Sequence, residues 1–183
     1  SALLKAFDVL KREGSIWRHV GKGTFIASTE PKSGSGSLAE LITKVTPITL
    51  MRSRLSLEPA IAREAAINAS GDAVSNLTII GHRTQAADNW EDYELFDDQF
   101  HRAIGIAADN PLLLSLFDHL NAVRRGVAWK TVVRSSVRPA FDHTSFAEHD
   151  QILAAIEARD PSAAHASMRT HLVSVSNRLF GDA

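Results

Sequence analysis

Prolines at the starts of long segments with helical periodicity constrain this fold more than any other feature of the sequence. Pro47, Pro111, Pro139 and Pro161 each stand at or near the start of a run in which apolar residues recur at helical spacing, and proline is tolerated in the first turn of a helix but not in its interior. Neither strand alternation nor an internal repeat is evident after residue 28. We therefore predict a mainly α fold, an antiparallel bundle of six to seven helices. The expected helices span residues 38–45, 47–69, 71–87, 91–108, 111–133, 139–159 and 161–180.

The first 28 residues follow a different pattern. Apolar side chains recur at helical spacing over residues 3–10, and Gly14 is a typical helix stop. Residues 15–20 and 24–27 then form two short strand-like runs, separated by the turn sequence Gly21-Lys22-Gly23. This order predicts a helix followed by a β-hairpin with a basic tip.

Charge is distributed unevenly along the chain. Residues 1–32 hold six basic and three acidic side chains, whereas residues 33–183 hold 14 basic and 18 acidic ones. Such asymmetry suggests a segment that binds a polyanion, joined to a domain with another task. The hairpin is then either an ordinary surface hairpin or the wing of a winged helix. In a wing, Arg18 and Lys22 would contact the DNA backbone.

A short Gly/Ser-rich stretch separates the two patterns. Residues 29–37 read Thr-Glu-Pro-Lys-Ser-Gly-Ser-Gly-Ser, a composition typical of flexible linkers. The predicted organisation is a small basic segment (residues 1–28), a linker (residues 29–37) and an acidic helical domain (residues 38–183).

Composition excludes several classes of protein. The chain of 183 residues contains no cysteine, which excludes disulfide frameworks, thiolate metal sites and cysteine nucleophiles and leaves histidines and carboxylates as metal ligands. A net charge of −1 excludes a uniformly basic nucleic-acid coat. No apolar run approaches the length of a membrane span, and the start of the sequence shows no signal-peptide pattern. We expect a cytoplasmic protein without membrane contact.

Three of the predicted helices each turn a histidine toward apolar neighbours. Asp97 and His101 are four residues apart and share one helix face, while His149 and His171 lie on the apolar stripes of the last two helices. An ionised aspartate buried without a partner is costly. A divalent metal shared by Asp97, His101, His149 and His171 would remove that cost, and it accepts nitrogen and oxygen ligands.

The alternative interpretation is that each of these histidines is a hydrogen-bonded core residue without a ligand role. The other histidines have no acid at ligand spacing or lie off the apolar stripe, and we expect them at the surface or rim. They are His82, His119, His143 and His165.

Arg54 lies on the inward stripe of its helix, together with Leu50 and Ile61. A buried arginine needs an anion. That anion is either an internal carboxylate, such as Glu58 four residues later, or the carboxylate of a small organic acid held by two parallel hydrogen bonds.

Residues 10–27 resemble the end of the winged helix-turn-helix domain of GntR-family bacterial regulators. The similarity is carried by Leu10, by Glu13-Gly14 and by the wing motif from Gly21 through Gly23-Thr24-Phe25. It implies an incomplete winged helix in which Lys5 lies in the recognition helix. Lys5, Arg18 and Lys22 are therefore the expected DNA-binding residues.

The helical part resembles the FCD domain of the FadR subfamily of GntR regulators. The segments RLSLEPAIAREAA, DDQFHRAIGIAADNPLL and AEHDQILAAIEARDPSAAHASMRTHL occur in the expected order. The resemblance implies a metal bound by Asp97, His101, His149 and His171, with zinc the first expectation and nickel or manganese tolerated. It also implies that Arg54 binds the effector.

Together these expectations describe a bacterial transcriptional regulator and not an enzyme. A homodimer would bind operator DNA through residues 1–28 and sense a small organic carboxylate with residues 38–183. Two alternatives stay open on sequence alone. One is a metal-dependent enzyme using the same histidines and aspartate, with Asp98 or Glu148 as the base, although both read as solvated residues. The other is a purely structural metal site.

Overall fold

The computed structural model describes residues 6–7, 9–10, 16–19, 23–26, 38–127 and 136–181. It divides into two units, Ser1–Ser37 and Leu38–Ala183, and each is described by itself.

In the first unit two short strands pair in antiparallel fashion. They are β1 (Ile16–His19) and β2 (Gly23–Ile26), with Ile16 opposite Ile26 and His19 opposite Gly23. Residues 6–7 and 9–10 are helical. The turn at residues 20–22 and the linker at residues 29–37 lie outside the described residues, so the wing and the linker stay predictions.

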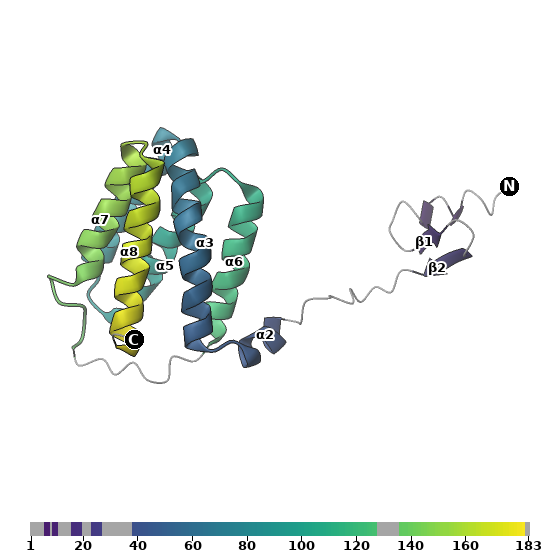
Figure 1. Cartoon of the computed structure of the whole chain (residues 1–183), viewed down its shortest axis with the longest axis horizontal. Helices are drawn as coiled ribbons and strands as arrows, with labels where there is room; N and C mark the ends of the chain where they lie inside the picture. Colours follow the sequence, from purple (N-terminus) through teal and green to yellow (C-terminus); the bar gives the residue numbers. More distant parts are fainter. Residues whose placement is uncertain are drawn as a thin grey trace. The chain divides into compact units, whose positions relative to one another are not determined.

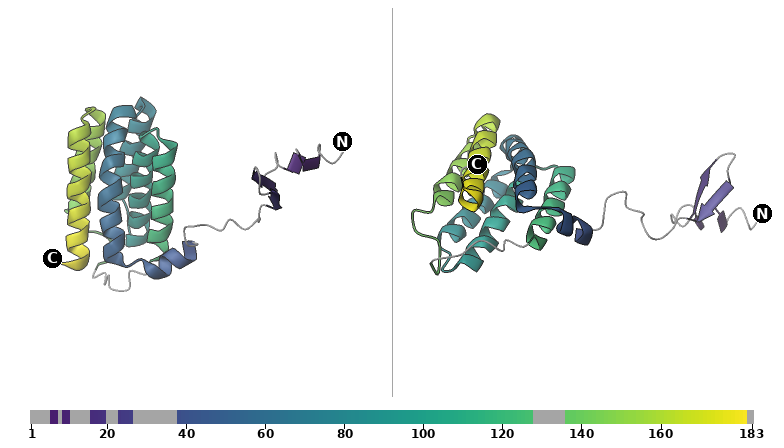
Figure 2. Two further views of the ribbon diagram at one scale, coloured as in Figure 1. Left: turned by 45° about the vertical axis from the view of Figure 1, so that its right-hand side comes forward. Right: turned by 60° about the horizontal axis from the view of Figure 1, so that its bottom comes forward.

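The second unit is a bundle of helices packed side by side, as Figures 1 and 2 show. This confirms the predicted mainly α bundle. Within the described residues, no helix is both long and apolar enough to cross a membrane. The helices are α2 (Leu38–Lys44), α3 (Pro47–Asn68), α4 (Gly71–Gln85), α5 (Trp90–Ala107), α6 (Pro111–Gly126), α7 (Thr144–Glu157) and α8 (Pro161–Phe180).

Most of the helices begin at a residue whose side chain caps the first turn. Thr46, Ser70, Asn89, Asn110 and Asp160 each accept a hydrogen bond from a backbone N–H two or three residues later. These side chains satisfy donors that have no partner inside the helix. Three of the five are followed by proline in the first helical position, which explains why the predicted starts of α3, α6 and α8 are correct.

Two predicted boundaries differ from the observed ones by more than two residues. The helix expected to reach residue 133 ends at Gly126, because Val127 already has an extended backbone. A Cβ atom at Gly126 would lie 2.3 Å from Cδ1 of Ile42, so the absence of a side chain lets α2 pack against the end of α6. The helix expected from Pro139 begins at Thr144 and follows a turn. Phe141 in this turn is exposed, so its side chain does not contribute to an apolar helix face that packs on the bundle.

Two tight connections of the same form join α5 to α6 and α7 to α8. In each, one residue takes a left-handed backbone, Asp109 with φ 48° and Arg159 with φ 55°. Arg159 also donates side-chain hydrogen bonds to the backbone oxygens of Ile67 and Ala69 at the end of α3. It therefore satisfies carbonyls that the end of the helix leaves without partners.

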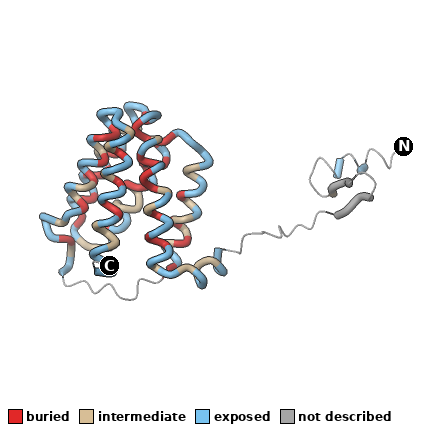
Figure 3. Tube along the Cα trace, in the orientation of Figure 1, coloured by how far each residue is buried: buried red, intermediate tan, exposed pale blue. Residues whose placement is uncertain are grey.

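Helix α3 packs against α5, α6, α7 and α8. Figure 3 shows buried residues along the faces that these helices turn toward one another. The main core consists of apolar side chains from α3, α4, α5, α7 and α8, with Phe117 of α6. A smaller cluster of Leu50, Val123 and Val127 holds α2. Since α3, α5, α7 and α8 share one core, polar residues on their inward faces meet inside it.

Candidate metal centre and adjoining cavity

Four sequence-predicted site residues come together inside the bundle. Asp97 and His101 project from α5, His149 from α7 and His171 from α8, and one potential ligand atom from each lies within 4.8 Å of those of the others. The spacing of four residues places Asp97 and His101 one helical turn apart on the same face. The packing of α7 and α8 supplies the other two.

The facing atoms are three imidazole nitrogens and one carboxylate oxygen. Oδ1 of Asp97 lies 3.5 Å from Nε2 of His149 and 4.0 Å from Nε2 of His101. Nε2 of His101 lies 3.2 Å from Nε2 of His171. All three histidines are buried, while the Asp97 side chain is 18% exposed. The cluster therefore reaches solvent only on its aspartate side.

Two further carboxylates fix the orientation of two of the rings. Nδ1 of His101 lies 2.6 Å from Oε2 of Glu58, and Nδ1 of His171 lies 2.8 Å from Oε2 of Glu148. A carboxylate accepts from Nδ1–H, so the Nε2 lone pair of each neutral ring points into the cluster. Metal-binding histidines in proteins are held in this way.

His149 carries the clearest indication that the cluster fits a cation. Its side chain is 2% exposed, and neither ring nitrogen has a hydrogen-bond partner among the described residues. Its ring stacks on Phe100 with centroids 4.4 Å apart. Buried polar atoms are nearly always paired. A metal ion at the shared centre would satisfy its Nε2 atom and separate the Nε2 lone pairs of His101 and His171.

The electrostatics favour the protonation states that a metal requires. Burial lowers the pKa of His149 well below its ordinary value and also lowers that of His171. Burial alone would raise the pKa of Asp97, but at acid pH the positive charge on the neighbouring histidines outweighs burial and lowers that pKa to about 2. Neutral imidazoles beside an ionised carboxylate are the ligand forms that bind divalent metals.

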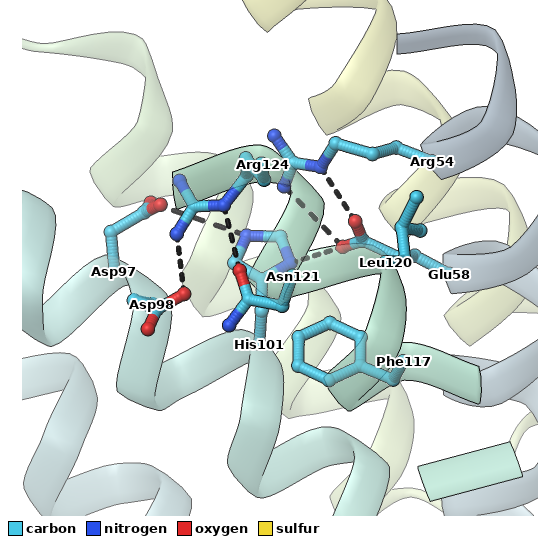
Figure 4. A pocket seen from close by; sticks show the side chains of 9 residues that line it. All are labelled: Arg54, Glu58, Asp97, Asp98, His101, Phe117, Leu120, Asn121 and Arg124. Atoms are coloured by element: carbon cyan, nitrogen blue, oxygen red, sulfur yellow. Dashed lines mark hydrogen bonds and ion pairs between the residues drawn. The ribbon is translucent and has the colours of Figure 1, made fainter. Parts of the chain in front are cut away.

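A small cavity adjoins the cluster on its Asp97 side. Its volume of about 10 Å³ is roughly that of one water position. Figure 4 shows side chains from three helices directed toward this space. The lining residues are Arg54 and Glu58 of α3, Asp97, Asp98 and His101 of α5, and Phe117, Leu120, Asn121 and Arg124 of α6.

Arg54 is buried in the wall of this cavity and is paired with Glu58. Nε of Arg54 donates to Oε1 of Glu58 at 2.6 Å, and Nη2 donates to Oε2 at 3.4 Å. The internal carboxylate considered from the sequence is therefore its partner here. Among the described residues, the hydrogen-bond acceptor of Nη1 is the sulfur of Met51, at 3.9 Å, a weak acceptor. The Nη1 end of the guanidinium can therefore donate to a stronger hydrogen-bond acceptor.

Sequence reasoning missed the roles of several acids. Asp98 and Glu148 were expected to be solvated, but their side chains are 20% and 14% exposed and both are paired. Arg124 donates to Asp98, and Glu148 lies behind His171. Their partners lie on other helices, so no local spacing indicated these bonds. Asn121 and Arg124 could have been found, because they follow Phe117 at helical spacing.

The remaining predicted residues are placed as follows. His82, His119 and His165 are exposed, as expected. His143 is partly buried, and its ring contacts Trp90, Tyr93 and Phe146. For the expected DNA-binding residues, Arg18 lies in β1, whereas Lys5 and Lys22 lie outside the described residues.

Comparison with protein families identifies the FCD domain over residues 49–174. Among curated proteins, the chain is 29% identical to the "Uxu operon regulator" of Haemophilus influenzae over 96% of its own length and 66% of that protein's length. It is 26% identical to the "Exu regulon transcriptional regulator" of Escherichia coli, with coverage of 97% and 69%. It is 28% identical to the "HTH-type transcriptional repressor NanR" of Salmonella arizonae, with coverage of 94% and 67%. The chain thus spans about two thirds of the length of these relatives.

Solved structures show the same fold. A Streptococcus agalactiae GntR protein superimposes with a TM-score of 0.56 at 24% identity, over 92% of this chain and 77% of the other. E. coli McbR/YncC superimposes with a TM-score of 0.62 at 17% identity, over 96% and 82%. At these identities the similarity concerns the fold alone.

Proposed function

Because the chain belongs to the FCD-domain family of GntR-type transcriptional regulators, we propose that it is a metabolite-responsive DNA-binding regulator. Residues 1–28 would bind operator DNA, and residues 38–183 would sense a small organic carboxylate in a metal-containing pocket. The observation that carries the sensing role is the buried cluster of Asp97 with three histidines beside a cavity lined by arginines.

The proposed metal ligands are Asp97, His101, His149 and His171, with zinc as the expected ion. The donor set supports this choice, because neutral imidazoles and a carboxylate suit zinc, and nickel or manganese tolerate the same ligands. When bound, the ion would act as a Lewis acid that coordinates the effector's carboxylate. Glu58 and Glu148 would hold the rings of His101 and His171 in place.

Arg54 is the proposed effector-binding residue of the protein chain itself. It lies in the wall of the cavity, close enough to Asp97 for the carboxylate to affect its electrostatics. The charge of its guanidinium would favour an anionic effector over a neutral one of the same shape.

The enzyme alternative gains no support. The relatives are named as operon or regulon regulators and a repressor. The two acids considered as catalytic bases are occupied, Asp98 by arginines and Glu148 by His171. A base needs a free lone pair directed at a substrate proton.

Operator binding belongs to the same proposal. Lys5, Arg18 and Lys22 would contact DNA, and a homodimer would present two winged helices to two half-sites. Effector binding and operator binding would then be linked reciprocally. Since the partner is DNA, the proposed location is the cytoplasm.

The metal is tested by elemental analysis of the purified protein before and after chelation. We expect about one equivalent of a divalent transition metal and a lower melting temperature after chelation, since a ligand that binds only the folded state stabilises it. His101→Ala and His149→Ala should each lower the metal content while most helicity remains. His165→Ala, an exposed histidine of α8, is the matched control. Full occupancy in both site variants would refute the assignment.

Operator binding is tested by selecting genomic fragments with the full-length gene product and measuring their affinity by fluorescence anisotropy. Lys22→Ala should weaken binding almost equally across sequences and make the salt slope shallower by about one. An unchanged slope would remove Lys22 from the backbone contacts, and failure to enrich any fragment would refute the regulator proposal.

A further inference from the structure

The cavity is lined by two guanidinium groups from different helices. Arg54 comes from α3 and Arg124 from α6, and Figure 4 shows both directed toward the space above Asp97 and His101. Nε of Arg124 donates to Oδ1 of Asn121 at 2.8 Å. The Arg124 side chain is only 21% exposed. A partly buried arginine beside a cavity lined by charged side chains can bind an anion.

Asp98, the present partner of Arg124, would keep a compensating positive charge if Arg124 moved away. Arg124 donates to Oδ1 of Asp98, while Nη1 of Arg125 lies 3.4 Å from Oδ2 of the same carboxylate. If Arg124 turned away, Arg125 would still compensate the charge of Asp98. Breaking a buried ion pair is costly chiefly because it leaves a charge uncompensated. This shared carboxylate reduces that cost on the Asp98 side, and the moving Arg124 then needs a new anion.

The cavity as it stands admits only about one water, because its volume is about 10 Å³. Any organic acid must therefore displace one of the lining side chains. Phe117 and Asn121 are buried on α6, and Arg54 is held by Glu58. Arg124 is the lining cation whose present partner, Asp98, is also paired with a second cation, Arg125. Its movement would open the cavity without leaving the charge of Asp98 uncompensated.

We propose that Arg124 exchanges Asp98 for a second carboxylate of the effector, so that the pocket is specific for organic dicarboxylates. One carboxylate binds at the metal and Arg54, and the other binds Arg124, with the amide of Asn121 beside it. This inference rests on the proposed function, since it takes for granted that the pocket binds an organic acid. Beyond that function, it identifies Arg124 as the residue that binds the second carboxylate and predicts a preference for diacids.

The test compares succinate with butyrate, and glutarate with valerate, by calorimetric titration of the metal-loaded protein. These pairs share a chain length and differ by one carboxylate. We expect the diacid of at least one pair to bind about tenfold more tightly, the effect of one added charge-assisted contact. Arg124→Gln should reduce that ratio to about one while the metal content stays unchanged. Asp98→Asn should raise diacid affinity, because it removes the competing carboxylate.

Arg102→Gln is the charge-matched control, because Arg102 pairs with Asp118 on the surface with its side chain 46% exposed. It should leave the ratio as it is in the unmodified protein. Equal binding of monoacids and diacids, or an unchanged ratio in Arg124→Gln, would overturn this inference while leaving the carboxylate-sensing function in place. If neither class of acid binds the metal-loaded protein, the sensing function and this inference both fail.

Discussion

His149 differs from the other two histidines of the cluster in what its ring contacts. His101 and His171 each have a carboxylate behind them, whereas His149 has the ring of Phe100. In the metal-free protein, its buried nitrogens lower stability, because they lose water without gaining a partner. The same nitrogens become an advantage when a cation is present.

His149→Phe should therefore separate stability from metal binding. We expect the metal-free variant to melt at the same or a higher temperature than the unmodified protein, and to lose the chelator-sensitive shift. His101→Ala should instead lower the stability of the metal-free protein by about 2–4 kcal/mol, since it leaves a cavity and removes a bond to Glu58. Thermal melts with and without chelator distinguish the two. A metal-dependent shift that persists in His149→Phe would contradict the ligand assignment.

Glu58 contacts both Arg54, the proposed effector-binding residue, and His101, a proposed metal ligand. Glu58→Gln should lower metal affinity about 10- to 100-fold and the free energy of unfolding by about 3–5 kcal/mol, because Arg54 would remain buried without a hydrogen-bonded counter-charge. Competition with a metal indicator and denaturant unfolding measure the two effects. Glu64→Gln, which breaks a pair with Arg63 at the surface, should cost less than about 1 kcal/mol. Equal losses in both variants would show that Glu58 has no special role.

At this scale the meeting of the four side chains was predictable, and the carboxylates that hold two of the rings were not. The helical period places Asp97 and His101 on one face and turns His149 and His171 inward, and the structure brings these four together. Glu148 could not be assigned, because its partner is 23 residues away on another helix. Local spacing indicates direction, and only packing decides which directed side chains meet.

At the scale of elements, the connections are the informative parts. The starts of α3, α6 and α8 follow from a capping side chain and a proline, both of which are visible in the sequence. The end of α6 and the start of α7 do not. Gly126 ends its helix where Ile42 of α2 packs against it, a contact between segments far apart in the chain.

The two left-handed residues provide a test of the connections. Asp109→Gly should raise the free energy of unfolding by about 0.5 kcal/mol, since glycine adopts this backbone without a steric cost. Asp109→Ala should lower it by a similar amount. Arg159→Gly, at the equivalent position, should be destabilising, because the bonds of Arg159 to the end of α3 would be lost. Urea unfolding measures all three. A gain in Arg159→Gly equal to that in Asp109→Gly would disprove the capping role.

At the scale of the whole molecule, the buried histidines make the stability of the metal-free protein depend on pH. The pKa values of His149 and His171 are lowered in the folded state from the ordinary 6.5. As the pH falls below about 6.5, the unfolded chain takes up protons that the folded chain does not, so stability decreases. The limiting slope is about 1.4 kcal/mol per pH unit for each histidine.

This prediction is checked by urea unfolding of the chelated protein between about pH 5 and pH 7, above the range in which carboxylates titrate. His149→Phe should reduce the slope of stability against pH by up to about 1.4 kcal/mol per pH unit, the contribution of one proton. A stability that does not change over this range would contradict the lowered pKa values. The metal-loaded protein should lose its ion over the same range, because protons compete for the imidazoles.

The ligands of the proposed ion lie on three helices, α5, α7 and α8, and in the sequence they extend from Asp97 to His171. The three histidines are buried, and only the aspartate is partly open. For an ion held there, successive exchange of its ligands for water would be slow, because the three histidines are almost completely shielded from solvent. Its release would instead wait for α7 or α8 to separate from α5. The lifetime of the bound ion is therefore set by how often the bundle opens locally, and the ion would stay in place through many cycles of effector binding.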